Sequence, residues 1–228
     1  MMNWTGCLEL VITGFVCGSV PWGYLVGRAH GIDIRQHGSG NIGATNVFRV
    51  LGKKWGILVF FLDALKGVAA VVGGWFLARA VGTDEQLAGI VTGIACILGH
   101  NYTPWLGFKG GKGIATSAGV LATILWLPML IGLGIWALVV WLTRMVSAGS
   151  IAAAASLPLS TWFLTLGTPN HVIMTGFAML MATLAIWRHR TNIQRILAGT
   201  ENRFGKAKTG ERVGDNGDRV EDKKESKL

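Results

Sequence analysis

The chain has 228 residues, of which 51% are hydrophobic and only 14% are charged, and it contains ten tryptophans. This composition excludes an ordinary soluble domain and indicates a protein that crosses a membrane several times. The net charge of +9 would also suit nucleic acid, but almost all lysines and arginines lie between apolar runs or in the C-terminal tail. The positive-inside rule explains that distribution, so we expect a lipid bilayer and no nucleic acid as partner.

The first apolar segment covers residues 8–28 and contains Pro21, which we expect to weaken or kink a helix. No positively charged region precedes this segment. We therefore expect a membrane span with the N-terminus outside, rather than a cleavable signal peptide.

A second span is expected over residues 56–80, in which Asp63 and Lys66 lie three positions apart on one helical face. Unpaired charge inside a membrane is costly, so we expect these residues to pair with each other or with polar loops. A packing ion pair and a functional one are equally compatible with this spacing.

A third span is expected over residues 86–99, and further spans over residues 150–166 and 171–187. Two apolar runs between them, 114–127 and 129–143, are expected to break at Pro128. Each run is short for the roughly 20 residues that a span needs, which leaves tilted helices and a re-entrant hairpin both open. The predicted fold is an all-α, polytopic membrane helical bundle of about seven transmembrane helices, or five if the short runs do not span.

The distribution of basic residues predicts the orientation of this bundle. With the N-terminus outside and the C-terminus cytoplasmic, only Arg79 among the basic residues of loops and helix ends lies outside. The basic residues on the cytoplasmic side are then Arg28, Arg35, Arg49, Lys53, Lys54, Lys109, Lys112, Arg144, Arg188 and Arg190. We expect a transmembrane domain over residues 1–204 and a disordered, charged cytoplasmic tail over 205–228, which has almost no apolar residues.

The most informative stretch is 99–119, which carries six glycines and several cationic or amide side chains between two apolar runs. Glycines lack a Cβ and accept positive φ, so consecutive backbone N–H groups can converge on one anion beside the two lysines. We predict a phosphate site from His100, Asn101, Lys109, Gly110, Gly111, Lys112 and Gly113. The spacing is not that of a Walker loop, and the alternative is a flexible cytoplasmic loop whose lysines set topology.

A second polar stretch, between residues 29 and 55, has a similar glycine-rich character. Its candidate anion-binding residues are Gly38, Ser39, Gly40, Asn41, Gly43, Thr45, Asn46 and Arg49, with a short helix beginning near Thr45. Free N–H groups at a helix N-terminus favour anions, and an arginine grips two oxygens at once. The alternative is an N-cap and turn with basic residues that set topology.

A third polar stretch covers residues 188–204, where His189 and Asn192 lie three positions apart and share a face on a continuing helix. Arg190 and Arg195 follow nearby, and Gly199 is placed to end the helix. The alternative role is an interfacial anchor. We favour a site, because all three polar stretches are predicted to share the cytoplasmic face.

The chemistry expected at this face needs neither a cofactor nor a metal. Cys7, Cys17 and Cys96 form no C-x-x-C pair and have no histidine at metal-ligand spacing, so we interpret them as small core residues. No nucleophilic triad is evident, and the H-x-x-x-x-D pattern of the common glycerolipid acyltransferases follows none of the histidines. A lipid-phosphate enzyme would therefore work by positioning and electrostatics on an activated donor.

Two other classes of membrane protein remain open on these residues alone. A transporter or carrier of a phosphorylated metabolite or lipid would place its charges near the bilayer midplane, whereas the polar motifs here cluster at one face. A lipid phosphatase would show a histidine or aspartate nucleophile or a metal cluster, and none stands out.

Three runs, GSGNIGATNVFR (38–49), GHNYTPWLGFKGGKGIAT (99–116) and RHRTNIQRILAGTE (188–201), resemble signature motifs of a bacterial family. This is the integral-membrane acyl-phosphate:glycerol-3-phosphate acyltransferase family, with its motifs in the same order. The resemblance implies transfer of a fatty acyl group from acyl-phosphate to the 1-hydroxyl of glycerol 3-phosphate, giving lysophosphatidic acid and phosphate. It also implies a multi-pass protein of the bacterial inner membrane with a cytoplasmic active site, functionally linked to the enzyme that makes acyl-phosphate.

On this resemblance we expect Ser39, Asn46 and Arg49 to bind glycerol 3-phosphate. We expect Lys112 and the Gly110–Gly113 backbone to stabilise the leaving phosphate, with help from Lys109. His189 and Asn192 are expected to orient the hydroxyl or a phosphate, and the proton passes either to His189 or to a phosphate oxygen.

Overall fold

The computed structural model describes residues 4–204, which form α-helices and 3-10 turns with no strand in that range. The first elements are α1 (Trp4–Ser19), α2 (Trp22–Ala29), the 3-10 turn η1 (Ile34–Gln36), α3 (Ala44–Leu51) and α4 (Lys53–Val81). They are followed by α5 (Glu85–Asn101), the 3-10 turn η2 (Pro104–Leu106), α6 (Ile114–Ile124), α7 (Trp126–Thr143), α8 (Val146–Thr165), α9 (His171–Arg188) and α10 (Arg190–Leu197). The predicted tail, 205–228, lies outside the described residues.

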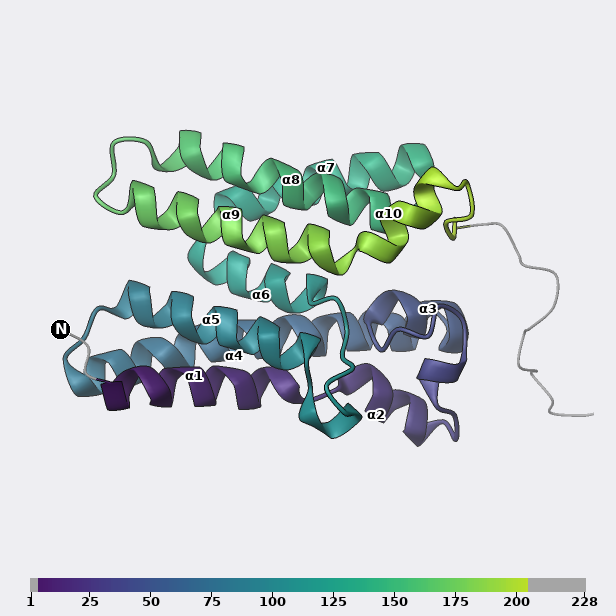
Figure 1. Cartoon of the computed structure of the whole chain (residues 1–228), viewed down its shortest axis with the longest axis horizontal. Helices are drawn as coiled ribbons and strands as arrows, with labels where there is room; N and C mark the ends of the chain where they lie inside the picture. Colours follow the sequence, from purple (N-terminus) through teal and green to yellow (C-terminus); the bar gives the residue numbers. More distant parts are fainter. Residues whose placement is uncertain (1–3, 205–228) are drawn as a thin grey trace, which may run out of the picture.

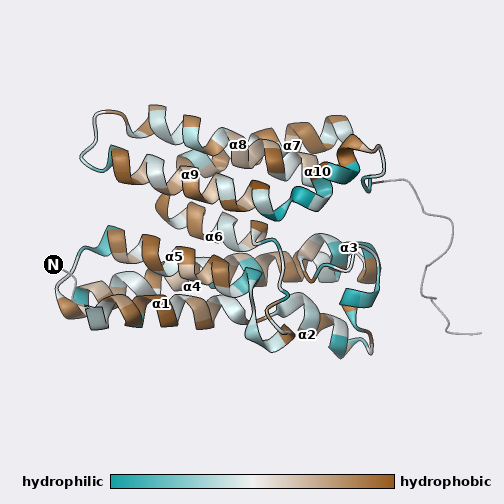
Figure 2. Ribbon diagram, in the orientation of Figure 1, coloured by the Kyte–Doolittle hydropathy of each residue, from teal (hydrophilic) through white to brown (hydrophobic). Residues whose placement is uncertain are grey.

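The helices form two groups that meet at α6. In Figure 1, α1, α4 and α5 lie together in one group, α7, α8 and α9 lie together in the other, and α6 runs between them. The short helices α2, α3 and α10 gather toward one end of the long axis. Figure 2 shows that hydrophilic residues concentrate at this same end, while the long helices are mostly hydrophobic.

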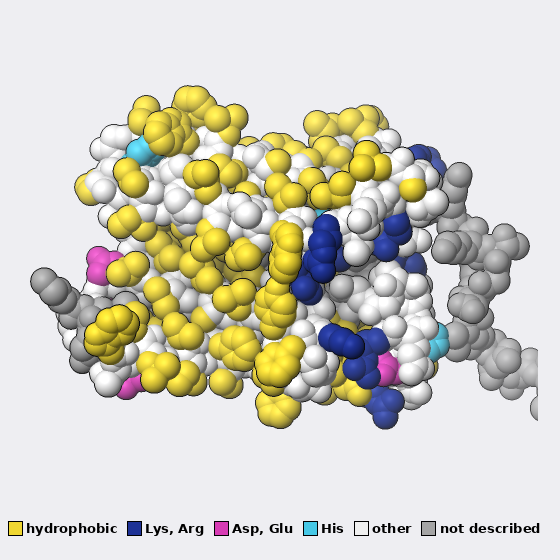
Figure 3. Space-filling view, in the orientation of Figure 1, with side chains coloured by type: hydrophobic (Ala, Val, Ile, Leu, Met, Phe, Trp, Pro, Cys, Tyr) yellow, Lys and Arg dark blue, Asp and Glu magenta, His cyan; other side chains and the backbone are white. Residues whose placement is uncertain are grey.

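The long helices have the length and composition of membrane spans. Among residues 4–204, four stretches are long and apolar enough to cross a bilayer: Trp4–Ala29, Lys53–Val81, Trp126–Thr143 and His171–Arg188. Large hydrophobic side chains such as Phe61, Trp141 and Phe163 are exposed on the outside of the bundle. Hydrophobic side chains are spread over the part of the face in Figure 3 where the long helices lie, and the lysines and arginines lie toward the polar end. The predicted all-α membrane bundle is confirmed.

The first span is interrupted at the predicted proline. α1 ends at Ser19 and α2 begins at Trp22, because Pro21 cannot continue the helical hydrogen-bond ladder. The carbonyl groups near the break find new donors: Thr103 Oγ1 donates to the oxygen of Ser19 at 2.6 Å, and Lys66 Nζ donates to the oxygen of Val20 at 2.9 Å. The expected kink is therefore confirmed and is held by side chains from two other elements.

The second expected break is displaced by three residues. The expectation of an interruption at Pro128 is wrong, because α6 ends at Ile124 and α7 begins at Trp126. Pro128 lies in the first turn of α7, where its missing N–H has no intrahelical partner to lose. The break gives a short α6 of 11 residues and an α7 of 18 residues, which is long enough to span.

The third polar stretch also differs from a continuous helix. α9 stops at Arg188 and α10 starts at Arg190, with His189 between them, yet the amide of Asn192 still donates to the oxygen of His189 at 2.8 Å. α10 ends at Leu197 and Gly199 follows with φ +70°, as predicted for the helix stop.

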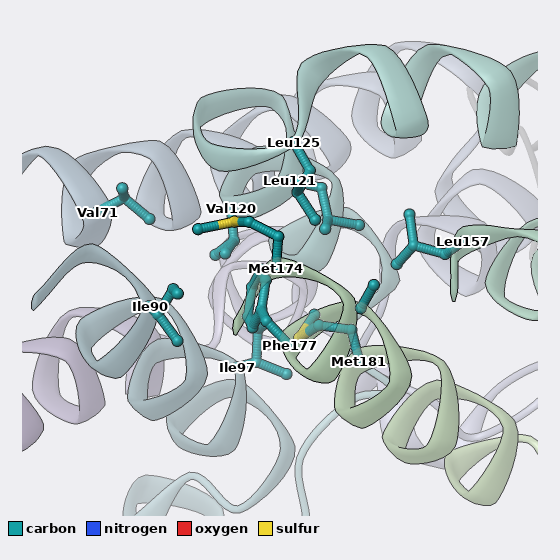
Figure 4. Packing of buried hydrophobic residues seen from close by; sticks show 11 residues of the cluster. Val71, Ile90, Ile97, Val120, Leu121, Leu125, Leu157, Met174, Phe177 and Met181 are labelled. Carbon is teal, nitrogen blue, oxygen red and sulfur yellow. The ribbon is translucent and has the colours of Figure 1, made fainter. Parts of the chain in front are cut away.

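The hydrophobic core joins the two helix groups (Figure 4). Its buried members are Val71, Ile90, Ile97, Val120, Leu121, Leu125, Leu157, Met174, Phe177, Ala178 and Met181, contributed by α4, α5, α6, α8 and α9 and the residue between α6 and α7. Close helix contacts depend on glycines: a Cβ at Gly18 would overlap the backbone of Cys96, and one at Gly119 would overlap that of Ala64. The core thus fixes both groups around α6, which begins at the glycine-rich loop.

Candidate active site

A cavity of about 170 Å³ opens at the polar end, where the three predicted polar stretches meet. It is bounded by the loop before α3 and α3 itself, the start of α6, the first turns of α8, and the α9–α10 corner. Its polar and charged lining residues are Ser39, Asn41, Thr45, Asn46, Arg49, Asp63, His100, Lys112, Ser147, Ser150, His189, Asn192, Arg195, Glu201 and Asn202.

The first wall is built around the buried side chain of Asn46, which is 1% exposed. Its Oδ1 accepts the amide of Ser39 at 2.8 Å, and its Nδ2 donates to the carbonyl oxygens of Ile34 and His37 at 3.2 and 3.0 Å. Both amide protons are therefore used within the protein. Asn46 holds the loop at Ser39 against α3, from which Thr45 and Arg49 reach the cavity.

The second wall is the glycine-rich loop that leads into α6. The amides of Gly110 and Gly111 each donate over 3.1 Å, to the oxygens of Asn101 and His100 respectively. Gly113 has φ +79° and is the N-cap of α6, so Gly113, Ile114 and Ala115 line the cavity at a helix N-terminus. The first N–H groups of a helix have no intrahelical partner and carry partial positive charge, which favours an anion.

A chain of polar contacts connects this wall to the α9–α10 corner. Lys112 Nζ donates to Asn192 Oδ1, and Asn192 Nδ2 donates to Glu201 Oε1 at 2.7 Å. Glu201 also accepts from Ser147 Oγ on α8 and from Arg195 Nε, each at 2.8 Å. One carboxylate thus connects α8 to α10 at the edge of the cavity and directs the oxygen of Asn192 toward Lys112.

The unpaired charge in the cavity is positive. Arg195 pairs with Glu201 and Lys66 pairs with Asp63, whereas neither Arg49 nor Lys112 forms an ion pair with any residue in 4–204. Burial, together with the charge of Arg195, lowers the pKa of Lys112 to about 8. A half-buried ammonium with a depressed pKa and no carboxylate partner among residues 4–204 favours binding of an anion.

His189 lies beside this charge and is only 3% exposed. Its Nδ1 is 2.8 Å from the oxygen of Ala185, and because a carbonyl oxygen only accepts, Nδ1 carries the proton. Burial and the charge of Lys112 lower the pKa of His189 to about 4. The ring is therefore neutral near pH 7, and Nε2 presents a lone pair that accepts a hydrogen bond.

A second charged cluster lies deeper, between α4 and α5. Lys66 Nζ is 2.8 Å from Asp63 Oδ1, 2.9 Å from His100 Nδ1 and 2.9 Å from the oxygen of Val20. The expected pairing of Asp63 with Lys66 is confirmed. Since Lys66 donates to Nδ1 of His100, the proton of that ring is on Nε2, below the glycine-rich loop.

An apolar pocket of about 180 Å³ adjoins the charged cavity. The two spaces share the lining residues Phe60, Ile114, Trp136 and Ser150. The other residues around the pocket are Ser117, Ala118, Leu121, Met129, Gly132, Leu133, Ala153, Ala154, Leu157, Met181 and Ala185, from α6, α7, α8 and α9. An amphiphilic molecule fits this pair of spaces, with its charged group in the cavity and its chain in the pocket.

The predicted site residues divide into two groups. Those lining the cavity are Ser39, Asn41, Gly43, Thr45, Asn46, Arg49, His100, Lys112, Gly113, His189 and Asn192. Those outside the lining are Gly38, Gly40, Asn101, Lys109, Gly110, Gly111 and Arg190. Lys109 and Arg190 are exposed, and the guanidinium of Arg190 lies 4.8 Å from the ring centre of Trp187.

Sequence reasoning missed Ser147, Ser150 and Glu201 as cavity residues. Glu201 had a usable signal, because it is the only acidic residue among the arginines of 188–204. Ser147 and Ser150 had none: they lie in an apolar run and reach the cavity only because α8 packs against the α9–α10 corner.

Fold and site together define an integral membrane protein with a cationic cavity joined to an apolar pocket. Residues 8–199 match the family model described as glycerol-3-phosphate acyltransferase. The glycerol-3-phosphate acyltransferase of Synechococcus sp. (strain JA-3-3Ab) is 43% identical over 206 residues, covering 90% of this chain and 97% of the relative. That of Desulforamulus reducens is 42% identical over 202 residues, covering 88% and 96%.

Two solved structures are also similar. They are crystal structures of PlsY (YgiH), an integral membrane glycerol 3-phosphate acyltransferase, in a glycerol 3-phosphate form and a lysophosphatidic acid form. Their TM-scores are 0.76 and 0.74, each at 41% identity, covering 87% of this chain and 96% and 95% of theirs. This chain belongs to the glycerol-3-phosphate acyltransferase family, and it is a membrane acyltransferase of phospholipid synthesis.

Proposed function

We propose that this enzyme takes its acyl group from acyl-phosphate and transfers it to the 1-hydroxyl of glycerol 3-phosphate. The observation that carries the proposal is that the cationic cavity and the apolar pocket adjoin each other, with four lining residues in common. These boundary residues, which we call the shared wall, are Phe60, Ile114, Trp136 and Ser150. An acyl-phosphate bound across this wall has its chain among apolar side chains, its phosphate at Lys112, and its carbonyl carbon at the boundary. The similar structures in glycerol 3-phosphate and lysophosphatidic acid forms support the acceptor and the product.

Glycerol 3-phosphate binds at the first wall. Arg49, which has no ion-pair partner among residues 4–204, grips its phosphate, with Ser39 and Thr45 as hydrogen-bond donors beside it. Gly38, Gly40, Asn41 and Gly43 shape the loop: Gly38 and Gly40 have φ +62° and +71°, and Asn41 Oδ1 accepts the amide of Gly43 at 2.8 Å. Asn46 acts by holding this loop, since its amide protons are already donated.

The acyl-phosphate phosphate binds at the second wall. The ammonium of Lys112 and the first N–H groups of α6 face the position where negative charge grows as the phosphate leaves. Asn101, Gly110 and Gly111 hold the backbone of this wall, and His100 supports it from below. The exposed Lys109 and Arg190 attract anionic substrates toward the cavity.

The reaction is a direct acyl transfer without a covalent enzyme intermediate. Acyl-phosphate is a mixed anhydride with a good leaving group, so holding the hydroxyl against its carbonyl is sufficient. The hydroxyl oxygen bonds to the carbonyl carbon, the bond from that carbon to the phosphate oxygen breaks, and the hydroxyl proton passes to a phosphate oxygen. His189 Nε2 accepts the hydrogen bond of the attacking hydroxyl, but with a pKa of about 4 it is a poorer final proton acceptor than a phosphate.

The first experiment compares donors. Enzyme purified in detergent receives radiolabelled glycerol 3-phosphate with either palmitoyl-phosphate or palmitoyl-CoA, and lysophosphatidic acid is counted. We expect product from acyl-phosphate only. Product from acyl-CoA alone would keep the acyltransferase class and overturn the donor.

Substitution of His189 tests the proton step. With His189→Gln, kcat should fall about 10²-fold while the KM of acyl-phosphate changes little, because only the orientation of the hydroxyl is lost. Nearly full turnover in His189→Ala would exclude any role of this ring in the reaction.

The orientation in the membrane is part of the proposal. The seven apolar helical segments, counting α1 and α2 as one, cross the bacterial inner membrane with the N-terminus outside and the site at the cytoplasmic face. Support comes from the basic residues, which gather at the polar end in Figure 3. Alkaline phosphatase fused after Thr83 should be active and green fluorescent protein fused after Phe204 should fluoresce; the reverse pattern would invert the topology.

Residues 1–204 form the catalytic domain, so a chain ending at Phe204 should keep full turnover.

A further inference from the structure

Arg188, the last residue of α9, contacts the glycine-rich loop without reaching the cavity. Its Nη2 donates to three carbonyl oxygens: those of Asn101 and Gly110, both at 3.4 Å, and that of Gly111. The guanidinium also lies 5.2 Å from the ring centre of Tyr102. Arg188 is half-buried and is absent from the cavity lining, so it does not contact the bound phosphate directly.

These contacts determine which way the loop's peptide groups point. In a trans peptide the C=O and the following N–H point in opposite directions. Because the carbonyls of Gly110 and Gly111 are held by Arg188, they do not present partial negative charge to an anion in the cavity. Glycines hold no conformation by themselves. The amides of Gly110 and Gly111 are fixed by the oxygens of Asn101 and His100, and Arg188 adds the contacts that fix their carbonyls.

The same contacts connect the two parts of the reaction centre. Arg188 immediately precedes His189, and the amide of Asn192 donates to the oxygen of His189. The loop that carries Lys112 is thereby fastened to the segment that carries His189 and Asn192. The bond from Lys112 to Asn192 also connects them.

We propose that Arg188 is a positioning residue of the acyl transfer, which locks the glycine-rich loop in its anion-binding conformation and fixes it relative to His189. The proposal rests on the proposed function, since it assumes that the loop binds the acyl-phosphate phosphate. All three bonds come from one nitrogen, Nη2, which the planar guanidinium places at the carbonyls while it lies over the ring of Tyr102. A lysine keeps the charge but lacks the flat group that stacks on this ring and orients that nitrogen.

The test uses Arg188→Gln and Arg188→Lys in the full chain, with KM and kcat measured for palmitoyl-phosphate and glycerol 3-phosphate. The inhibition constant of inorganic phosphate, which competes with acyl-phosphate, measures how tightly the loop binds an anion. We expect kcat/KM for palmitoyl-phosphate to fall about 10²-fold in Arg188→Gln, with at least a tenfold rise in KM and in the inhibition constant of phosphate. The KM of glycerol 3-phosphate should stay within twofold, because Arg49 and Ser39 lie on the other wall.

Arg188→Lys separates positioning from charge. If only the positive charge mattered, the lysine variant would match the parent, and the proposal would be overturned. We expect Arg188→Lys to regain less than a tenth of the kcat/KM that is lost in Arg188→Gln. Arg79→Gln is the matched control. Arg79 is an exposed arginine in the last turn of α4, where it pairs with Glu85 and does not line the cavity.

The alternative outcomes are distinct. A purely structural role would lower the amount of active enzyme, and so kcat, with KM and phosphate inhibition unchanged in both variants. That result would refute the proposal, as would unchanged kinetics. If Arg188→Gln fails to fold, the same constants in Arg188→Lys decide. Parent enzyme that makes no lysophosphatidic acid from palmitoyl-phosphate would overturn the proposed function instead.

Discussion

Two charged clusters border the same cavity, and they differ in how far their hydrogen bonds are satisfied. In the deep cluster, the ammonium of Lys66 has the three acceptors Asp63, His100 and the oxygen of Val20, and is 5% exposed. In the cluster near the cavity, Lys112 has one side-chain partner, Asn192, which is itself held by Glu201.

This difference distinguishes a lysine that supports the fold from one that can bind an anion. A cation with three acceptors has no donor left for a substrate, so Lys66 closes the break at Pro21 and neutralises Asp63. A cation with a single neutral partner keeps its charge available for an anion. The number of acceptors around each lysine thus predicts support for Lys66 and anion binding for Lys112.

Replacing the saturated lysine should have the largest effect, and it should be on stability. Lys66→Met leaves Asp63 buried without its partner, which costs about 3–5 kcal/mol of unfolding free energy. Thermal unfolding in detergent measures the loss. The double variant Asp63→Asn/Lys66→Met should be more stable than Lys66→Met, since no uncompensated charge remains; equal stability would contradict this account.

Replacing the unsaturated lysine should affect activity instead. Lys112→Met removes the charge that we propose to stabilise the leaving phosphate, so kcat/KM should fall by about 10²–10³-fold. The unfolding temperature should change little, because the lost contact is one bond to a neutral amide. Lys53→Met, an exposed lysine outside the cavity, is the matched control. A large loss of stability with normal turnover per folded molecule would assign Lys112 to support.

The pH dependence of the free enzyme should report the same residue. The pKa of Lys112 is depressed to about 8, so the side chain is charged below that pH and neutral above it. Phosphate binding needs the charged form, and kcat/KM should therefore fall about tenfold per pH unit above the pKa. In Lys112→Arg this alkaline limb should disappear, because a guanidinium stays charged. A limb that persists in the arginine variant would belong to another group.

The smallest expected effect concerns the apolar pocket. Ala154→Leu places three extra carbon atoms in the space that we assign to the acyl chain, so palmitoyl-phosphate should lose about tenfold in kcat/KM and decanoyl-phosphate less. The KM of glycerol 3-phosphate should not move. Equal losses for both chain lengths would place the chain elsewhere.

Much of the molecule follows from local patterns in the sequence. The spans, the kink at Pro21, the pair of Asp63 with Lys66 and the helix stop at Gly199 each depend on residues close together in the chain. The convergence of the three polar stretches was expected from the predicted topology, and residues from all three line the cavity. The same local reasoning predicted the helix break at Pro128, whereas the break lies at Leu125. A proline is equally acceptable in the first turn of the next helix, which is where Pro128 lies.

What could not be predicted depends on packing between distant elements. Ser147 meets Glu201 across 54 positions, and Arg188 meets the glycine-rich loop across about 80. Asn46 illustrates a different limit: its position beside the cavity was predicted, but only the structure shows that its amide protons are already donated to Ile34 and His37. Residue type identifies a possible ligand, and the surrounding acceptors decide whether it is available.

The wall at Phe60, Ile114, Trp136 and Ser150 also has a consequence for how turnover ends. The product keeps both a phosphate and a long chain, and exposing a palmitoyl chain to water would cost roughly 12 kcal/mol at about 0.8 kcal/mol per methylene. An exit through water would therefore be far slower than synthesis. With the acyl chain in the apolar pocket, as we propose, the newly made lipid is expected to leave sideways into the leaflet, so that each reactant stays in its own solvent throughout turnover.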